Sequence, residues 1–271
     1  MRIAVTGHKG RLGSQLCKLG CIPFDCDVLN YQHIQQEIVK TLPDIIIHCA
    51  SVTDVDGAEF ELKFLTREVN ERGTFNLRRF FDGRIIYIST DYVFDGKKGP
   101  YSEKDIPNPV NHYGLTKYLG EKVLELSPFN NYESTIVRTT NLYGGNKEDF
   151  AFRILANLML GNKFTVTNKV YGNATYVPHL AKALLELCEL PNLPKVINIA
   201  GSDILSRYEF AVMIANVFEY DTSLITPTNE VPGEAKRPVK GGLKLTLAKS
   251  LGLTIYSALE GLQELKQRIL K

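Results

Sequence analysis

A glycine-rich turn at the start of the chain constrains its fold more than any other feature. Residues 2–6 have the apolar pattern of a short buried strand, residues 7–13 read G-H-K-G-R-L-G, and residues 14–19 have a helical pattern. In such a strand–turn–helix unit Gly7 permits a tight turn, Gly10 lets backbone approach a pyrophosphate, and Gly13 lets helix pack on strand. The free N–H groups at the helix N-terminus then face the phosphates. The turn therefore predicts a dinucleotide site, with an ordinary β–α loop as the alternative.

Charged residues near this turn bear on which dinucleotide binds. An acidic residue closing the second strand, expected at residues 21–24, would favour NAD through the ribose hydroxyls. Asp25 and Asp27 are the candidates, but both are displaced into the following loop. Lys9 and Arg11 lie in the turn itself, where they can reach a ribose 2′-phosphate. This arrangement favours NADPH, with NADH, or loop charges that are simply solvated, as alternatives.

Two further strand ends are expected beside the turn. Residues 44–49 form a continuous apolar strand whose end lies next to that of the first strand in a doubly wound sheet, at the crevice where a ligand binds. The small residues that follow this strand, and that leave room for a cofactor, are Ala50, Ser51 and Thr53. Residues 84–88 form another strand, which brings the hydroxyls of Ser89 and Thr90 to an edge of the sheet.

A tyrosine–lysine pair follows on a helix expected from about residue 113 to 126. Tyr113 and Lys117 are four residues apart, so they lie on one face, one turn apart. Tyr118/Lys122 and Tyr143/Lys147 have the same spacing, so spacing alone is not diagnostic, but only the first pair accompanies a strand that ends in Ser-Thr. A nearby cation lets a phenol, whose pKa is roughly 10 when unperturbed, exchange a proton with a carbonyl oxygen near neutrality.

Composition indicates the class of protein and excludes several kinds of partner. Of 271 residues, 44% are apolar and 23% charged, with a formal net charge of +2, which gives no reason to expect nucleic acid or a membrane as partner. The first residues enter a strand pattern directly, which leaves no room for a signal peptide. Five cysteines without C-x-x-C spacing are typical of a reducing cytoplasm, and five scattered histidines predict no metal site.

Strand and helix patterns alternate along the chain. They predict an α/β fold, a Rossmann-type doubly wound parallel sheet with a small C-terminal lobe. We assign residues 1–145 to the Rossmann domain, to which residues 168–200 return with a strand at 195–199. Residues 146–167 and 201–271 form the lobe, which caps the edge of the sheet.

One long helix is expected inside the Rossmann domain, over residues 60–81. Asn70 lies within it and is expected to be a buried polar brace for neighbouring backbone rather than a catalyst.

Four motifs together resemble those of a known superfamily. They are T-G-x-x-G-x-x-G from residue 6, S-T-D-Y-V-F-D-G from residue 89, P-Y-x-E-x-D-x-P-x-P from residue 100 and N-x-Y-G-x-T-K-x-x-G-E from residue 111. The set resembles the extended short-chain dehydrogenase/reductase superfamily and, within it, the dTDP-4-dehydrorhamnose reductases. The resemblance implies a cytoplasmic NADPH-dependent reductase that delivers hydride to the C4 ketone of a dTDP-linked 6-deoxyhexulose, in the biosynthesis of dTDP-L-rhamnose.

The resemblance also implies roles for individual residues. Tyr113 would protonate the emerging alkoxide, Lys117 would hold the nicotinamide ribose, and Thr90 would hydrogen-bond the carbonyl oxygen. The C-terminal lobe would bind substrate, and the sugar would contact Thr90, Asp91 and Asn141. The residues expected at the cofactor are Gly7, Lys9, Gly10, Arg11, Leu12, Gly13, Asp27, Val28, Ala50, Ser51, Thr53, Tyr113 and Lys117.

Two departures from the family pattern fall in the expected sugar pocket. The family has a tryptophan where this chain has Asn141, and an R-P-x-N-S-x-L pattern where residues 237–243 read R-P-V-K-G-G-L. The hexose and the nucleotide base are therefore open. The alternatives are a non-catalytic NADP-binding regulatory subunit, similar to the β subunit of methionine adenosyltransferase, and a nucleotide-sugar epimerase. The expected partner is a nucleotide sugar, and a homodimer is left open.

Overall fold

The computed structural model describes residues 1–126, 134–145 and 148–270, and its centre is a six-stranded sheet in which every neighbouring pair is parallel. The order β10-β5-β4-β3-β1-β2 makes the gap between the ends of β1 and β3 the switch point, where ligands of such sheets bind. The strands are β1 (Ile3–Thr6), β2 (Ile22–Pro23), β3 (Ile45–His48), β4 (Arg84–Thr90), β5 (Ser134–Thr139) and β10 (Val196–Asn198). The expected doubly wound parallel sheet is confirmed, and the strand expected at 195–199 lies in it.

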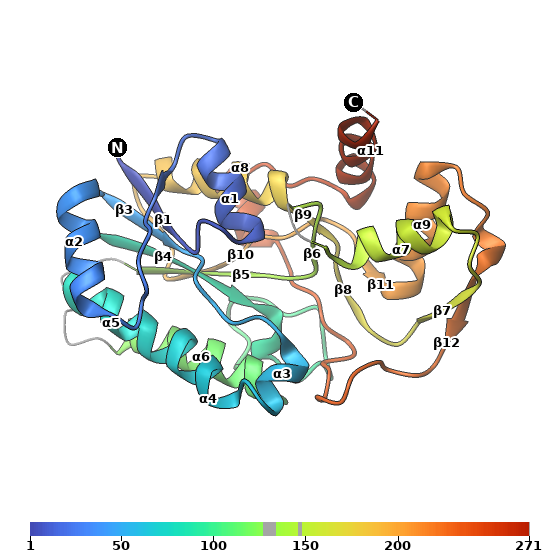
Figure 1. The fold of residues 1–271 in the computed structure, drawn as a ribbon, viewed down its shortest axis with the longest axis horizontal. Coiled ribbons are helices and arrows are strands. Elements are labelled where there is room, and N and C mark those ends of the chain that lie inside the picture. The colour runs from blue at the N-terminus through green and yellow to red at the C-terminus, as the bar shows by residue number, and fades with distance from the viewer. Residues whose placement is uncertain (127–133, 146–147, 271) are drawn as a thin grey trace.

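Helices cover both faces of this sheet (Figure 1). Ile47 and Ile86 pack on one face with α1 (Arg11–Lys18) and α8 (Val177–Glu189). Their neighbours Ile46 and Ile85 pack on the other face. The helices on that second face are α2 (Tyr31–Thr41), α5 (Gly73–Phe80) and α6 (His112–Glu125). Burial on both sides explains why these strands are continuously apolar.

A second lobe, with its own apolar core, lies at one end of the sheet (Figure 1). Leu155, Phe210 and Leu262 come from its three helices and are buried together. The helices are α7 (Phe150–Met159), α9 (Arg207–Phe218) and α11 (Ala258–Ile269), with a 3₁₀ turn at Thr222–Leu224. Three strand pairs complete it: β6 (Leu142–Tyr143) with β9 (Thr175–Tyr176), β8 (Tyr171–Asn173) with β11 (Ile204–Ser206), and β7 (Phe164–Thr167) with β12 (Ile225–Thr228).

The chain returns from this lobe to the Rossmann domain through residues 229–245, here called the connecting segment. It runs from β12 toward α3 (Val55–Glu59) along the lower edge of Figure 1. Arg237 Nη2 lies 2.7 Å from Asp56 Oδ2 on α3, and Asn111 Nδ2 donates to the Lys236 carbonyl oxygen over 2.7 Å. The segment therefore joins the two lobes beside the start of α6, and α10 (Thr246–Ser250) follows it.

The helix expected over residues 60–81 is divided in the structure. α4 (Lys63–Arg67) continues into a π-helical turn at Glu68–Arg72 and then into α5. Asn70 lies in that turn, where its Nδ2 donates to Val52 O over 3.1 Å and to Thr116 Oγ1 over 3.0 Å. The prediction of Asn70 as a buried polar brace is confirmed.

The start of the first helix also differs from the expected one. α1 begins at residue 11, after Gly10, rather than at residue 14. α7 begins at residue 150 because the Asp149 side chain accepts from Ala151 N and Phe152 N. The expected start of the lobe at residue 146, and Lys147 of the third tyrosine–lysine pair, lie outside the described residues. No helix in the described part of the chain is long and apolar enough to span a bilayer.

Candidate active site

The glycine turn between β1 and α1 is packed too closely for side chains. Gly7 has a φ of 63°, and a Cβ on it would lie 2.7 Å from the backbone N of Ala50. A Cβ on Gly13 would lie 2.3 Å from the Gly7 carbonyl oxygen. Gly10 precedes α1, and no described side chain caps the first turn of that helix. Its free backbone N–H groups, with that of Leu12 among them, fit the pyrophosphate of a dinucleotide.

The segment after β3 forms the adjacent wall. The backbone N–H of Ala50 donates to Thr6 Oγ1 over 3.2 Å, which ties this segment to β1. Ser51 Oγ donates to Asn70 Oδ1 over 2.8 Å, so the π-helical turn fixes the position of Ser51. Thr53 follows as an exposed residue. The structure thus holds Ala50 and Ser51 by hydrogen bonds beside the turn.

The predicted cations of the turn each have a partner. Lys9 Nζ lies 3.3 Å from Asp25 Oδ1, and both side chains are exposed. Arg11 Nη2 donates to the carbonyl oxygen of Glu148 over 3.0 Å, which links the turn to the start of the second lobe. Asp25, displaced into a loop in the sequence pattern, is therefore the carboxylate that contacts the turn.

The two residues expected near the adenine lie on the loop after β2. Asp27 is exposed, and its Oδ1 accepts a hydrogen bond from Leu29 N over 2.9 Å. Val28 is buried, and its side chain would collide with a Cβ on Gly73 of α5. Val28 is thus fixed by packing, whereas Asp27 is held by a local turn.

The hydroxyl at the end of β4 meets the phenol at the start of α6. Thr90 is the last residue of β4, and its hydroxyl accepts a hydrogen bond from Tyr92 N over 3.2 Å beside the phenol of Tyr113. Burial raises the pKa of Tyr113 above its usual value, and the neighbouring Thr90 hydroxyl opposes that rise. The ring of Tyr92 lies edge-on to that of Tyr113, with 5.8 Å between centroids. Two of the three predicted catalytic residues are therefore neighbours.

Lys117, the third, lies one turn further along α6 in the protein interior. Its side chain is buried, and Nζ lies 4.0 Å from the centroid of the Tyr87 ring. Burial lowers the pKa of Lys117 to about 7, and the carboxylate of Glu121 opposes this shift. Burial also lowers the pKa of His48 on β3 to about 3, with the charge of Lys117 acting in the same direction. Of these two groups, Lys117 therefore keeps its proton to the higher pH.

Asp91 follows Thr90 and turns its carboxylate toward the connecting segment. Its Oδ2 accepts from Gly242 N over 3.4 Å, and a Cβ on Gly241 would lie 3.0 Å from the same oxygen. Burial raises the pKa of Asp91 to about 6, while hydrogen bonds that include those of Gly242 N and Thr90 oppose the rise. A Cβ on Gly241 would also lie 2.8 Å from the Tyr171 carbonyl oxygen, so this position has no room for the serine of the family pattern unless a neighbour shifts.

Asn141 is bound by an arginine that sequence analysis missed. Asn141 has a left-handed φ of 47°, and its Oδ1 accepts from Arg207 Nη2 over 2.9 Å. The Arg207 guanidinium also lies over the Phe150 ring, 4.7 Å from its centroid. Arg207 comes from the first residue of α9, 66 positions away, and no local pattern marks it. Only the packing of the lobe brings it here.

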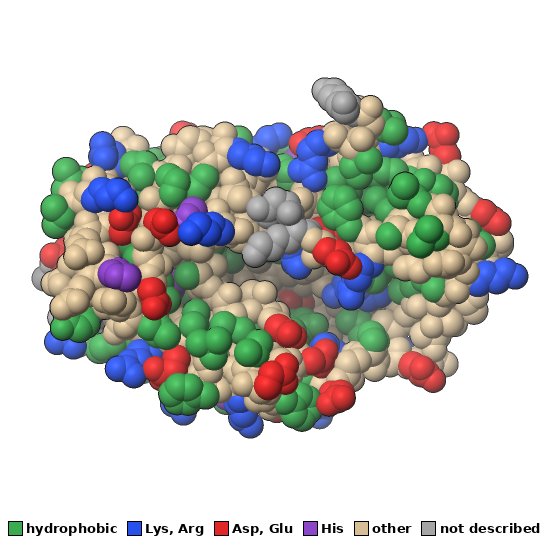
Figure 2. All heavy atoms as spheres, viewed as in Figure 1, with side chains coloured by type: hydrophobic (Ala, Val, Ile, Leu, Met, Phe, Trp, Pro, Cys, Tyr) green, Lys and Arg blue, Asp and Glu red, His purple; other side chains and the backbone are tan. Residues whose placement is uncertain are grey.

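The face of the molecule between the two lobes is hollowed, and Lys and Arg side chains gather on the right-hand side of the hollow (Figure 2). Burial lowers the pKa of Arg207, and Arg153 and Arg237 are cations that act in the same direction. Clustered guanidinium groups are suited to bind phosphate oxygens. The arrangement can therefore take a substrate that carries phosphate.

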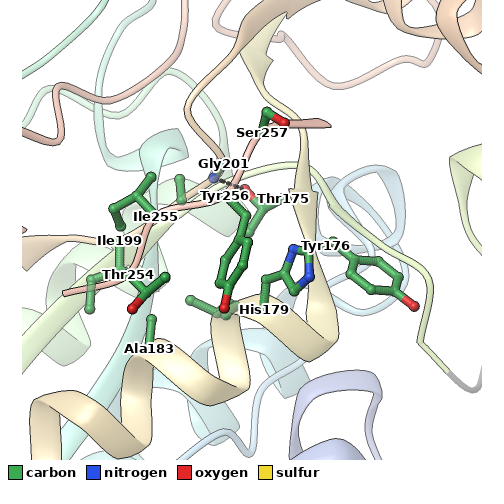
Figure 3. A pocket seen from close by; sticks show the side chains of 12 residues that line it. Thr175, Tyr176, His179, Ala183, Ile199, Gly201, Thr254, Ile255, Tyr256 and Ser257 are labelled. Carbon is green, nitrogen blue, oxygen red and sulfur yellow. Dashed lines mark hydrogen bonds between the residues drawn. The ribbon is translucent and has the colours of Figure 1, made fainter. Parts of the chain in front are cut away.

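A separate small cavity lies between α8 and residues 254–257 (Figure 3). His179 stacks on Tyr256 with centroids 3.8 Å apart, and its Nε2 lies 2.9 Å from Glu264 Oε2. The cavity measures about 10 Å³, which is room for one water at most. None of the predicted site residues lines it, so it is not part of the candidate active site.

Comparison with known proteins gives one family and several relatives of full length. The model of the RmlD substrate binding domain matches residues 1–270. A dTDP-4-dehydrorhamnose reductase of Mycobacterium tuberculosis is 31% identical, over 93% of this chain and 88% of its own. Methionine adenosyltransferase 2 subunit beta of Bos taurus is 30% identical, over 93% and 83%. The crystal structure of dTDP-4-dehydrorhamnose reductase from Bacillus anthracis in complex with NADP superposes with a TM-score of 0.90 at 29% identity, covering 98% and 99%.

Proposed function

The chain belongs to the family of the RmlD substrate binding domain, and we propose that it is an NADPH-dependent reductase of a nucleotide-linked 4-keto-6-deoxyhexose, converting dTDP-4-dehydrorhamnose to dTDP-L-rhamnose. The observation that carries the proposal is the placement of Thr90, at the end of β4, beside the Tyr113 phenol at the start of α6, with Lys117 one turn further along that helix. The glycine turn fits the dinucleotide, and the solved relative from Bacillus anthracis holds NADP.

The chemistry assigns one task to each residue. Bound NADPH supplies the hydride. The Thr90 hydroxyl donates a hydrogen bond to the ketone oxygen, and Tyr113 Oη transfers its proton to that oxygen as it becomes an alkoxide. Because burial raises the pKa of Tyr113, the phenol stays protonated until it is needed, and the ammonium of Lys117 offsets the negative charge that develops on it.

The sugar nucleotide is bound from the other side of the hollow. The Asp91 carboxylate accepts hydrogen bonds from hydroxyls of the hexose, and the Asn141 amide N–H groups donate to it. Arg207 offers its positive charge to the pyrophosphate. Asn141 itself, and Lys240 and Gly241 near Asp91, differ from the family pattern, so the hexose is the part of the proposal that most needs measurement.

The assay that tests the function mixes the purified chain with NADPH and a panel of nucleotide 4-keto-6-deoxysugars, with cofactor oxidation followed at the nicotinamide absorbance. Turnover of dTDP-4-dehydrorhamnose, with the rhamnose product identified, supports the proposal. Turnover of another member of the panel keeps the reductase and replaces the hexose. Interconversion of sugars without net oxidation of NADPH identifies an epimerase.

A second candidate is favoured by the similarity to methionine adenosyltransferase 2 subunit beta. A chain with that role would bind NADP, reduce no keto-sugar and form a stable complex with an adenosyltransferase. Gel filtration of the two proteins together, with and without NADP, separates this outcome from the first.

The choice of cofactor rests on Lys9 and Arg11. The double variant Lys9→Ala/Arg11→Ala should raise the Kd for NADPH and spare that for NADH, because only NADPH carries the 2′-phosphate. The effect should be about tenfold at most, because Lys9 is exposed and already paired with Asp25. Equal losses for both cofactors would overturn the assignment.

A further inference from the structure

Glu121 and Arg138 form a buried ion pair behind the proposed catalytic residues. Arg138 Nη2 donates to Glu121 Oε2 over 2.7 Å, and Arg138 Nε donates to Oε1 over 3.0 Å. The Arg138 side chain is 3% exposed and the Glu121 side chain is 0% exposed. Taking both charges out of water is costly, and such a pair is often replaceable by apolar residues without loss of stability. Stability alone is therefore a poor reason for its presence.

The pair joins the elements that carry the proposed catalytic residues. Glu121 lies one turn after Lys117 on α6. Ser89 Oγ donates to Glu121 Oε1 over 2.5 Å, and Ser89 immediately precedes Thr90. Arg138 is the register partner of Ser89 between β4 and β5. The Glu121 carboxylate thus ties α6 to the end of β4, and these two elements carry the proposed catalytic residues.

The charge of Glu121 also acts on Lys117. Burial lowers the pKa of Lys117, and the Glu121 carboxylate is the strongest influence in the opposite direction. The other titratable or charged groups around Lys117 are His48 and Cys49 on β3, Tyr87 on β4, Tyr113 on α6 and Arg138 beyond Glu121. Intact, the pair has no net charge. Replacing one member of the pair leaves one unpaired charge near Lys117. That charge is positive if Glu121 is replaced and negative if Arg138 is replaced.

We propose that Glu121 and Arg138 are a positioning pair that orients Lys117 and keeps it cationic, without touching substrate or cofactor. The inference rests on the role proposed above for Lys117 at the nicotinamide ribose. It goes beyond that role because it makes the protonation of Lys117 depend on two residues that lie behind the site.

The test measures the Kd for NADPH from nicotinamide fluorescence, using the full chain, between about pH 6 and pH 9, a range set around the pKa of Lys117. Affinity should fall as pH rises and Lys117 loses its proton. This fall in affinity with rising pH is here called the limb. Lys117→Met assigns this limb, because that variant should bind weakly with no such limb. An unmodified chain whose affinity is independent of pH over this range would overturn the inference.

Single variants of the pair should move the limb in opposite directions. Glu121→Gln leaves the Arg138 cation unpaired, which disfavours a second cation and moves the limb to lower pH by about one unit. Arg138→Met leaves the Glu121 carboxylate unpaired and moves the limb to higher pH. The double variant Glu121→Gln/Arg138→Met has no unpaired charge and should return toward the limb of the unmodified chain.

If the Glu121–Arg138 pair only supported the fold, a different result is expected. Both single variants would then weaken binding at every pH, with no shift of the limb or with shifts of the same sign, and either result refutes the proposal. If one single variant fails to fold, the sign of the shift in the other and the position of the double variant still decide. Because this readout needs no turnover, a chain that binds NADPH but reduces no keto-sugar refutes the proposed function and leaves the test of the pair intact.

Discussion

At the glycine turn the walls of the site are backbone, whereas in the proposed sugar pocket they are side chains. A Cβ on Gly13 would lie 2.3 Å from the Gly7 carbonyl oxygen, so neither position has room for a larger residue. In the sugar pocket, Asp91 and Asn141 come from strand ends, and Arg207 comes from the other lobe. A backbone wall tolerates few changes, whereas a wall of side chains can be altered one group at a time. The departures from the family pattern lie in the second kind of wall.

The largest effect should come from the residue between the two regions. Tyr113→Phe removes the proton donor and should lower kcat by about 10²–10⁴-fold, while the Kd for NADPH changes by a few-fold at most. Tyr118→Phe is the matched control, because Tyr118 has the same spacing to a lysine on the same helix. Stopped-flow reduction and fluorescence titration measure the two quantities. Substantial activity in Tyr113→Phe would remove the phenol from the mechanism.

The next effect probes the backbone wall. Gly13→Ala should weaken NADPH binding about tenfold to a hundredfold, because an added Cβ must displace the Gly7 carbonyl at an overpacking cost of about 1–3 kcal/mol. Gly161→Ala is the control: its φ is 67°, but nothing lies within 4 Å of its Cβ. That variant should lose a little thermal stability and keep its affinity. Equal affinity losses in both would mean that general strain, rather than the turn, sets binding.

Arg207→Met probes the wall of side chains. It should raise KM for the sugar nucleotide about tenfold, the value of one charge-assisted hydrogen bond, and leave the Kd for NADPH unchanged. Arg79→Met, which takes an arginine from the Phe80 ring on α5, is the matched control and should change neither constant. If Arg207→Met altered only NADPH affinity, the division between the two walls would be wrong.

The smallest effect is a pH dependence of stability at Asp91. Burial raises the folded-state pKa of Asp91 to about 6. The stabilisation that protonated Asp91 contributes to the free energy of unfolding is therefore present in full below the pKa of Asp91 in the unfolded chain, and it is lost as pH rises through 6. Between pH 7 and pH 5 the unmodified chain should therefore gain about 1 kcal/mol of unfolding free energy relative to Asp91→Asn. Urea unfolding at the two pH values measures the difference.

Asp105→Asn is the control for sign. Hydrogen bonds from Ser102 lower the pKa of Asp105, so its contribution is lost as pH falls rather than as pH rises. If Asp91→Asn and Asp105→Asn changed the pH dependence of the unfolding free energy in the same direction, Asp91 would not be the buried acid that we describe.

Local pattern was sufficient for the Rossmann domain. The glycine turn, the strand ending in Ser89-Thr90 and the helical spacing of Tyr113 and Lys117 could be recognised because each depends on neighbours within about one turn or one strand. The same reasoning placed Asn70 as a brace, but it missed the π-helical turn, since that turn is set by contacts with Val52 and Thr116. The four shortest strands of the lobe were missed because two or three residues carry no periodicity.

The sequence by itself determined the parallel sheet, the turn for a dinucleotide and the residues offered for proton transfer, because those depend on patterns that repeat over a few positions. The tertiary structure alone decided that Arg207 reaches Asn141, that Gly241 packs closely against Asp91 and that Arg138 closes on Glu121. Each of these contacts joins segments that only packing brings together, and their energies depend on burial, which no local pattern encodes.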